Sequence, residues 1–299
     1  MAPNLPAIII PVRCSSSPHS MSLASEITRI IDLFQFPFMQ RAVISGVLTG
    51  LAGGMLGSFT ILRQLSFFSD ALGHSTLLGL SFGILLGWNP TAIVLPFAVL
   101  FALGVTYLLE RTRLWTDALL NIVYSSSLAL AVIVLSFTGT YKGGIHQLLF
   151  GDILAVHTAD LFICGGLLLA CALYMGLTFR TQMLITLNEP LAVARGVSVS
   201  FHRTTFIVLL ALVVGISIKA VGVLLISAFI VIPACASRLL CRQFKHHIVL
   251  SASLGAISAV VGMLLSAGLN LPSGPSIVIA QLGIFVGAMI YPQLYKAFA

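Results

Sequence analysis

Two polar side chains of types that bind metal ions lie within a mainly apolar stretch from Leu65 to Gly87. Asp70 and His74 are four residues apart, so on a helix the carboxylate and the imidazole share one face. Such a pair can bind a divalent cation of the zinc or manganese kind, with further ligands from other helices. The alternative is a hydrogen bond between the two side chains that only tightens helix packing.

The composition is that of a membrane protein. Of the 299 residues, 59% are hydrophobic and 8% are charged, and the mean hydropathy is +1.10. A globular domain is about half apolar and about a quarter charged. The net charge of +7 does not indicate a nucleic-acid partner, because Lys and Arg lie at the ends of apolar runs, where they orient helices in the lipid bilayer. We therefore favour the metal site at Asp70 and His74, since ionisable residues inside membrane spans usually mark a pathway.

Successive apolar runs predict an all-α, polytopic membrane protein with eight or nine transmembrane helices. A helix of about 20 residues crosses the hydrocarbon core. Residues 1–38 are expected to be a flexible N-terminal extension, and residues 39–299 the transmembrane domain. The number of helices is given as eight or nine because glycines and a lysine interrupt residues 204–237. These residues could form two short spans or one span and a broken half-helix. The runs are 41–62, 66–87, 91–109, 116–138, 159–179, 204–218, 221–237, 248–268 and 276–295.

The basic residues predict the orientation of the chain. If nine spans are counted, most connections that carry arginine fall on one side of the membrane, among them Arg63, Arg111, Arg180, Arg203 and Arg238. The side richer in Lys and Arg is usually cytoplasmic. This places the C-terminus inside and the N-terminus outside.

The longest connection on the basic side contains the signals of a short helix. Pro190 suits a first helical turn, with Asn188 or Glu189 as its cap, and Gly196 suits a helix end. We expect a helix from Leu191 to Arg195 that lies on the membrane surface and is suited to docking a partner. The alternative is an ordinary turn between spans.

Glycine recurs every fourth residue in the first two predicted helices. Small residues at this spacing let helix backbones approach closely in lipid. In the second helix we expect the glycines to share the face of Asp70 and His74; ordinary glycine frequency in membrane helices is the alternative. The glycines are Gly46, Gly50 and Gly54 in the first helix and Gly79, Gly83 and Gly87 in the second.

A polar patch on the fourth predicted helix contains Asn121 and residues 125–127, which are all serine. These groups could hydrogen-bond across helices or line a route near Asp70. Hydrogen bonds between membrane helices are common and of modest strength. We favour the packing role.

The sequence lacks the phosphate-binding loop that ATP hydrolysis by P-loop enzymes needs. No Gly-x-x-x-x-Gly-Lys-Ser/Thr motif occurs, so the chain is not expected to be an enzyme, and its energy must come from a partner or an ion gradient. A self-sufficient, gradient-driven transporter or channel is the competing class, with Asp70 as a proton or cation relay. Such transporters often contain an inverted repeat, but the Asp-x-x-x-His pattern occurs once.

Short motifs over residues 36–296 resemble the permease subunit of zinc and manganese ABC importers, the ZnuB-type group of ABC-3 type importer permeases. They occur in the same order and at similar spacing, and the Asp-x-x-x-His motif is the most specific of them. The matching segments are 38–42 (FMQRA), 68–75 (FSDALGHS), 149–156 (LFGDILAV), 219–222 (KAVG), 232–234 (IPA) and 274–276 (GPS).

This resemblance implies a homodimeric permease in the inner (plasma) membrane, with two copies around one pathway for ATP-driven import of a divalent metal. It implies cytoplasmic P-loop ATPase subunits and an extracytoplasmic metal-binding protein as partners, and no cofactor besides the transported ion. Asp70 and His74 match the family's metal positions. Glu189, Ala192 and Gly196 match the coupling helix that sits in the groove of the ATPase.

One departure from the family pattern bears on the metal. Manganese-type members usually read Asp-Ala-x-Ser-His followed by Ala-Val-Leu-Pro. This chain has Gly73 before His74, and Ser-Thr-Leu-Leu at 75–78. The difference favours zinc, with manganese and iron as alternatives.

Overall fold

The computed structural model describes residues 36–87, 90–112, 114–138, 157–223, 225–269 and 271–298, and all regular structure in them is helical. The predicted extension up to residue 35 and the motif at 149–156 lie outside these residues. The first described helix begins at Pro37, so the last two residues assigned to the extension belong to it. The helices are α2 (Pro37–Leu62), α3 (Phe68–Leu85), α4 (Pro90–Arg111), α5 (Thr116–Thr138), α7 (Thr158–Leu177), α8 (Phe179–Leu187), α9 (Glu189–Ala194), α10 (Val199–Val221), α11 (Ile226–Leu240), α12 (Phe244–Leu269) and α13 (Ser273–Phe298).

Each of the nine predicted apolar runs corresponds to one helix. In the described part of the chain, seven helices are long and apolar enough to cross a membrane, namely α2, α4, α5, α7, α10, α12 and α13. The remaining two apolar helices are α3, with 18 residues, and α11, with 15 residues. Residues 204–237 form the full-length α10 followed by the short α11, and Gly222 between them has a φ of 90°. Only glycine adopts this backbone conformation readily, so the interruption seen in the sequence ends α10.

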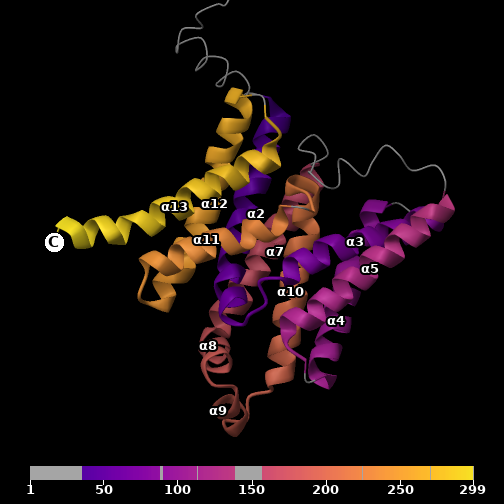
Figure 1. Cartoon of the computed structure of the whole chain (residues 1–299), viewed down its shortest axis with the longest axis horizontal. Helices are drawn as coiled ribbons and strands as arrows, with labels where there is room; N and C mark the ends of the chain where they lie inside the picture. The colour runs from indigo at the N-terminus through magenta and orange to yellow at the C-terminus, as the bar shows by residue number, and fades with distance from the viewer. Residues whose placement is uncertain are drawn as a thin grey trace, which may run out of the picture.

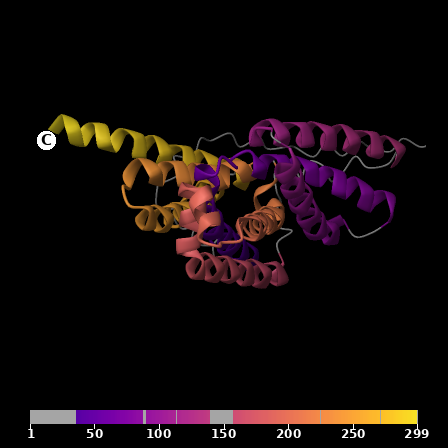
Figure 2. The same cartoon turned by 90° about the horizontal axis from the view of Figure 1, so that it is seen from below.

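Helix α2 lies at the centre of the bundle (Figures 1 and 2). It packs against α7, α10, α11 and α12. Helices α3, α4 and α5 form a group on one side of α10, and α11, α12 and α13 form a group on the other side of the molecule. The two groups therefore meet through α2 and α10, and through the contact of α3 with α11.

The glycines of α2 permit its central position. A Cβ added at Gly50 or Gly54 would collide with the backbone of α12 at Gly255 or Ser251. The Ser251 hydroxyl donates a hydrogen bond of 2.6 Å to the Gly54 carbonyl oxygen, which links the two backbones directly. Close approach is thus required at the predicted glycines of the first helix.

The prediction that the glycines of the second helix share the face of Asp70 and His74 is wrong at Gly79. Gly79 lies against the Phe97 ring of α4, and Gly87 has a φ of 68° with no neighbour near its Cβ position. Asp70 and His74 instead face α11 and α5. The reason is geometric, because nine residues at about 3.6 per turn place Gly79 roughly opposite Asp70 on the helix.

Side-chain contacts bring the basic connections to one end of the bundle, where α8 and α9 lie at the bottom of Figure 1. Arg63 at the end of α2 donates to Thr186 of α8 over 3.1 Å. Arg203 of α10 pairs with Glu189 of α9 at 2.7 Å, and Lys245 of α12 lies 6.0 Å from the centre of the Phe179 ring. This agrees with the predicted grouping, and we refer to this end as the basic end.

Gly54→Ala should destabilise the protein, because the added methyl group must displace the α12 backbone. Overpacking of this kind costs about 1–3 kcal/mol. Gly166→Ala in α7 is the matched control, since no atom lies within 4 Å of its Cβ position. Thermal unfolding in detergent should show a lower midpoint for Gly54→Ala only; equal midpoints would contradict the close α2–α12 contact.

Candidate metal site

Asp70 and His74 lie in the first two turns of α3 and share one face, as their spacing predicts. Their side chains do not hydrogen-bond to each other, because Asp70 Oδ1 and His74 Nδ1 are 3.8 Å apart. His74 Nδ1 lies instead 3.0 Å from the main-chain oxygen of Asp70. A carbonyl oxygen only accepts hydrogen bonds, so Nδ1 carries the proton and Nε2 keeps a lone pair. Imidazoles that bind metal are commonly oriented in this way by a backbone carbonyl.

Two other helices surround the pair. The Ser227 hydroxyl of α11 donates a weak hydrogen bond of 3.4 Å to Asp70 Oδ1. The Tyr124 ring of α5 meets the His74 ring edge to face, with centroids 5.0 Å apart and an interplanar angle of 88°. The side chains of Asp70 and His74 are 27% and 15% exposed. The carboxylate therefore remains accessible, whereas the imidazole is held between helices.

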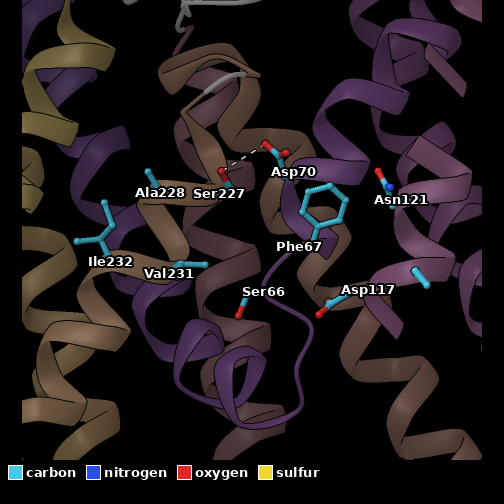
Figure 3. Close-up of a pocket in the computed structure, with 10 residues that line it drawn as sticks. Ser66, Phe67, Asp70, Asp117, Asn121, Ser227, Ala228, Val231 and Ile232 are labelled. Atoms are coloured by element: carbon cyan, nitrogen blue, oxygen red, sulfur yellow. Dashed lines mark hydrogen bonds between the residues drawn. The ribbon is translucent and has the colours of Figure 1, made fainter. Parts of the chain in front are cut away.

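The carboxylate of Asp70 faces an open groove of about 870 Å³ between α3, α5 and α11 (Figure 3). Four other polar residues line this groove: Ser66 before α3, Asp117 and Asn121 on α5, and Ser227 on α11. Apolar residues of α11 form much of the remaining wall. His74 is not among the lining residues and lies beside the groove, one turn further along α3.

Asp117 and Ser227 are groove residues that the sequence motifs do not indicate, and Asn121 is one for which a packing role is predicted. The structure places Asn121 on the groove wall, so its packing role is not supported. A signal for Asp117 was present, because Asp117 and Asn121 are four residues apart and share a helix face in α5. Ser227 had no local signal, since it is 157 residues from its partner Asp70.

Asp70 and His74 make an incomplete ligand set. Among the residues that the structure describes, no group of three or more His, Cys, Asp or Glu side chains could hold a metal ion. A bound zinc ion usually has four ligands. The pair can thus supply two protein ligands, and the described residues add no third His, Cys, Asp or Glu ligand to it.

The residues matched to the coupling helix lie far along the chain at the basic end. Glu189 is the first residue of α9, Ala192 is fully buried, and Gly196 follows the helix with a φ of 74°. Asn188 is the N-cap, because its side chain accepts a 3.0 Å hydrogen bond from the Leu191 amide. The predicted short helix is therefore present, and it begins two residues before the predicted start.

A bundle of membrane-length helices with a polar groove between three of its helices fits the class of membrane permeases. A family model described as the ABC 3 transport family matches residues 35–292. The chain belongs to this ABC-3 family and is a multi-pass membrane permease subunit of an ABC transporter, not its ATPase.

Named relatives match most of the chain. It is 30% identical to the manganese transport system membrane protein MntC of Listeria monocytogenes over 87% of this chain and 92% of the relative. It is 33% identical to the manganese import system permease protein ScaB of Streptococcus gordonii (86% and 92% covered), and 29% identical to the high-affinity zinc uptake system membrane protein ZnuB of Haemophilus influenzae (84% and 96% covered).

Solved structures share the fold. PsaBC from Streptococcus pneumoniae in complex with Fab matches with a TM-score of 0.76 at 32% identity, over 88% of this chain and 95% of that chain. An inward-facing conformation of a metal-chelate type ABC transporter matches with a TM-score of 0.65 at 18% identity, over 91% of both chains. At that identity the second match supports the fold alone.

Asn121→Cys should react with a charged thiol reagent, because position 121 faces the polar groove. Val132→Cys is the matched control on the same helix, since Val132 is exposed on an apolar stretch where a charged reagent has no water to reach it. Labelling of the purified protein, after subtraction of the native cysteines, should be fast at 121 and slow at 132. Equal rates would contradict a water-accessible groove at Asn121.

Proposed function

We propose that this chain forms the translocation pathway of an ATP-driven importer of divalent metal ions, with Asp70 and His74 as its transport site. The orientation of His74 carries the proposal. Its Nδ1 donates to a backbone carbonyl oxygen, which leaves the Nε2 lone pair available as a ligand. The relatives named for manganese and zinc transport support the same class of cargo.

An incomplete ligand set suits a transport site. A resident structural metal is enclosed by its full set of protein ligands, whereas an imported ion must be released again. The Asp70 carboxylate lies on the wall of an open groove, so the ion can enter and leave. The Asp70 and His74 pairs of two copies that face one another would supply four ligands.

We propose three kinds of partner for this permease. A second copy of the chain would close the groove as a homodimer, and an extracytoplasmic metal-binding protein would deliver the ion. Cytoplasmic P-loop ATPase subunits would bind at α9, where Glu189 and Gly196 are exposed, while the buried Ala192 packs the helix against Ile185 and Val199. The capped helix and its place at the basic end support this docking surface.

Two observations bear on which metal ion is transported, and they favour different ions. Gly73 before His74 and the segment after it favour zinc. The manganese relatives, at 30% and 33% identity, favour manganese. A carboxylate and an imidazole accept either ion. We retain zinc as the proposed cargo, and uptake of both ions by the same preparation tests it.

Asp70→Ala and His74→Ala should each abolish metal uptake without preventing assembly, because each removes a ligand from a two-ligand set. A packing role predicts a milder effect, since hydrogen bonds between membrane helices contribute only about 0.6 kcal/mol on average. The measurement is radioactive zinc and manganese uptake at equal membrane abundance. His246→Ala removes an exposed imidazole of α12 and is the control. Near-normal uptake in either site variant would assign the pair to packing.

Gly196→Val should reduce transport while metal binding persists, because valine is strained at the positive φ that ends α9. Gly196→Asn is the matched control, since asparagine tolerates this conformation. Uptake should be measured together with the amount of P-loop ATPase that co-purifies in mild detergent. Wild-type uptake and ATPase recovery in Gly196→Val would remove α9 as the coupling helix, and uptake without any ATPase would favour the gradient-driven alternative.

A further inference from the structure

Arg63, at the C-cap of α2, makes side-chain contacts that neither the transport site nor α9 explains. Its Nε donates to Thr186 Oγ1 at 3.1 Å, and its Nη2 donates to the Gln182 carbonyl oxygen at 3.3 Å and also to Gln182 Oε1. Its guanidinium carbon lies 4.5 Å from the centre of the Phe206 ring and 5.6 Å from that of Phe59. One cation thus joins α2, α8 and α10.

The charged guanidinium of Arg63 is stabilised by uncharged hydrogen-bond acceptors and aromatic rings. Burial lowers the pKa of the guanidinium to about 10, so the group stays charged at neutral pH. In the described part of the chain no carboxylate lies within ion-pair distance of it. Arginine suits this position because its planar group donates several hydrogen bonds while stacking on aromatic rings. A partly buried cation held in this way is oriented rather than free to move.

The hydrogen-bond partners of Arg63 lie on α8, the helix that directly precedes α9. Thr186 lies in the last turn of α8, two residues before the Asn188 cap. Gln182 is fully buried, and its Nε2 donates to the Tyr174 hydroxyl at 2.9 Å. The Gln182 side chain therefore bonds both to Arg63 and to Tyr174 of α7. Helix α8 thus connects Arg63 with α9, which follows α8 in the chain.

On the other side, Arg63 begins the turn that leads to the transport site. The α2–α3 turn, residues 63–67, is tightly built, because the Leu65 amide donates to the Thr60 carbonyl at 2.9 Å and the Phe68 amide donates to that of Leu65 at 2.9 Å. Gln64 adopts a φ of 56°, the one positive value among the described non-glycine residues. The backbone between Arg63 and α3 is thus fixed by hydrogen bonds.

The same turn forms part of the groove. Ser66 and Phe67 line it together with Asp70, which lies in the first turn of α3 (Figure 3). Leu65 and Phe68, on either side, are buried and hold the turn in the core. A movement of Arg63 along α2 would therefore change the wall next to the Asp70 carboxylate.

We propose that Arg63 is a positioning residue that transmits movement of α8 and α9 to the α2–α3 turn and so to the groove at Asp70. This inference rests on the proposed role of α9 as the coupling helix. It assigns the connection to one guanidinium and two α8 acceptors, Gln182 and Thr186. A two-state displacement of packed elements is the usual form of such coupling.

The test measures the number of zinc ions imported per ATP hydrolysed by the intact complex in proteoliposomes. Thr186→Val preserves volume and removes one acceptor of Arg63. Arg63→Lys preserves the charge, but the compact ammonium lacks the planar, forked donors that reach Thr186 and Gln182 while stacking on Phe206. We expect the ratio to fall about tenfold in Arg63→Lys, within the range of coupling between sites, and by less in Thr186→Val. ATP hydrolysis and zinc binding should persist in both variants.

Arg180→Lys is the matched control, because Arg180 is an exposed arginine on the same helix as Thr186. Its ratio should equal that of the wild type. Wild-type ratios in both Arg63→Lys and Thr186→Val, or an equal fall in Arg180→Lys, would overturn the role of Arg63. Gly196→Val separates this outcome from failure of the coupling helix: if Gly196→Val blocks uptake while Arg63→Lys does not, only the Arg63 inference fails.

Discussion

A carboxylate inside an apolar helix is the constraint on which the arrangement of this protein depends. Asp70 lies in α3, where exposure to hydrocarbon would be costly. The bundle meets this constraint by placing Asp70 on a polar groove between α3, α5 and α11, with Ser227 as a hydrogen-bond donor. The same groove gives the carboxylate access to an ion. The arrangement that satisfies the charge is thus also the one that the proposed transport site requires.

Close helix packing makes this solution possible. In lipid the hydrophobic effect does not drive helices together, so small residues and direct backbone approach hold the bundle. Gly50 and Gly54 let α2 meet α12, and the Ser251 hydroxyl bonds across that contact. With α2 fixed at the centre, α10 and α11, which both contact α2, also contact α3. The groove therefore depends on contacts made far from it.

The basic end has a different construction, with short helices and polar side chains in place of long apolar faces. Asn188 caps α9, and Glu189 pairs with Arg203 of α10. Arg63, Gln182 and Thr186 connect this region to the end of α2. Because the α2–α3 turn follows Arg63 directly and also lines the groove, the two functional regions are joined by a short, hydrogen-bonded stretch of chain.

The sequence by itself determined the class of protein, the helical runs and the local pairs. Asp70 with His74 and Asn188 with Gly196 are close in sequence, so helix periodicity and capping rules place them without knowledge of the fold. Only the tertiary structure decided that Asp117, Asn121 and Ser227 share a groove with Asp70, and that Gly79 of α3 faces α4 instead. The physical reason is that these neighbours come from different helices, and the contacts between helices depend on side-chain packing over the whole bundle rather than on any local pattern.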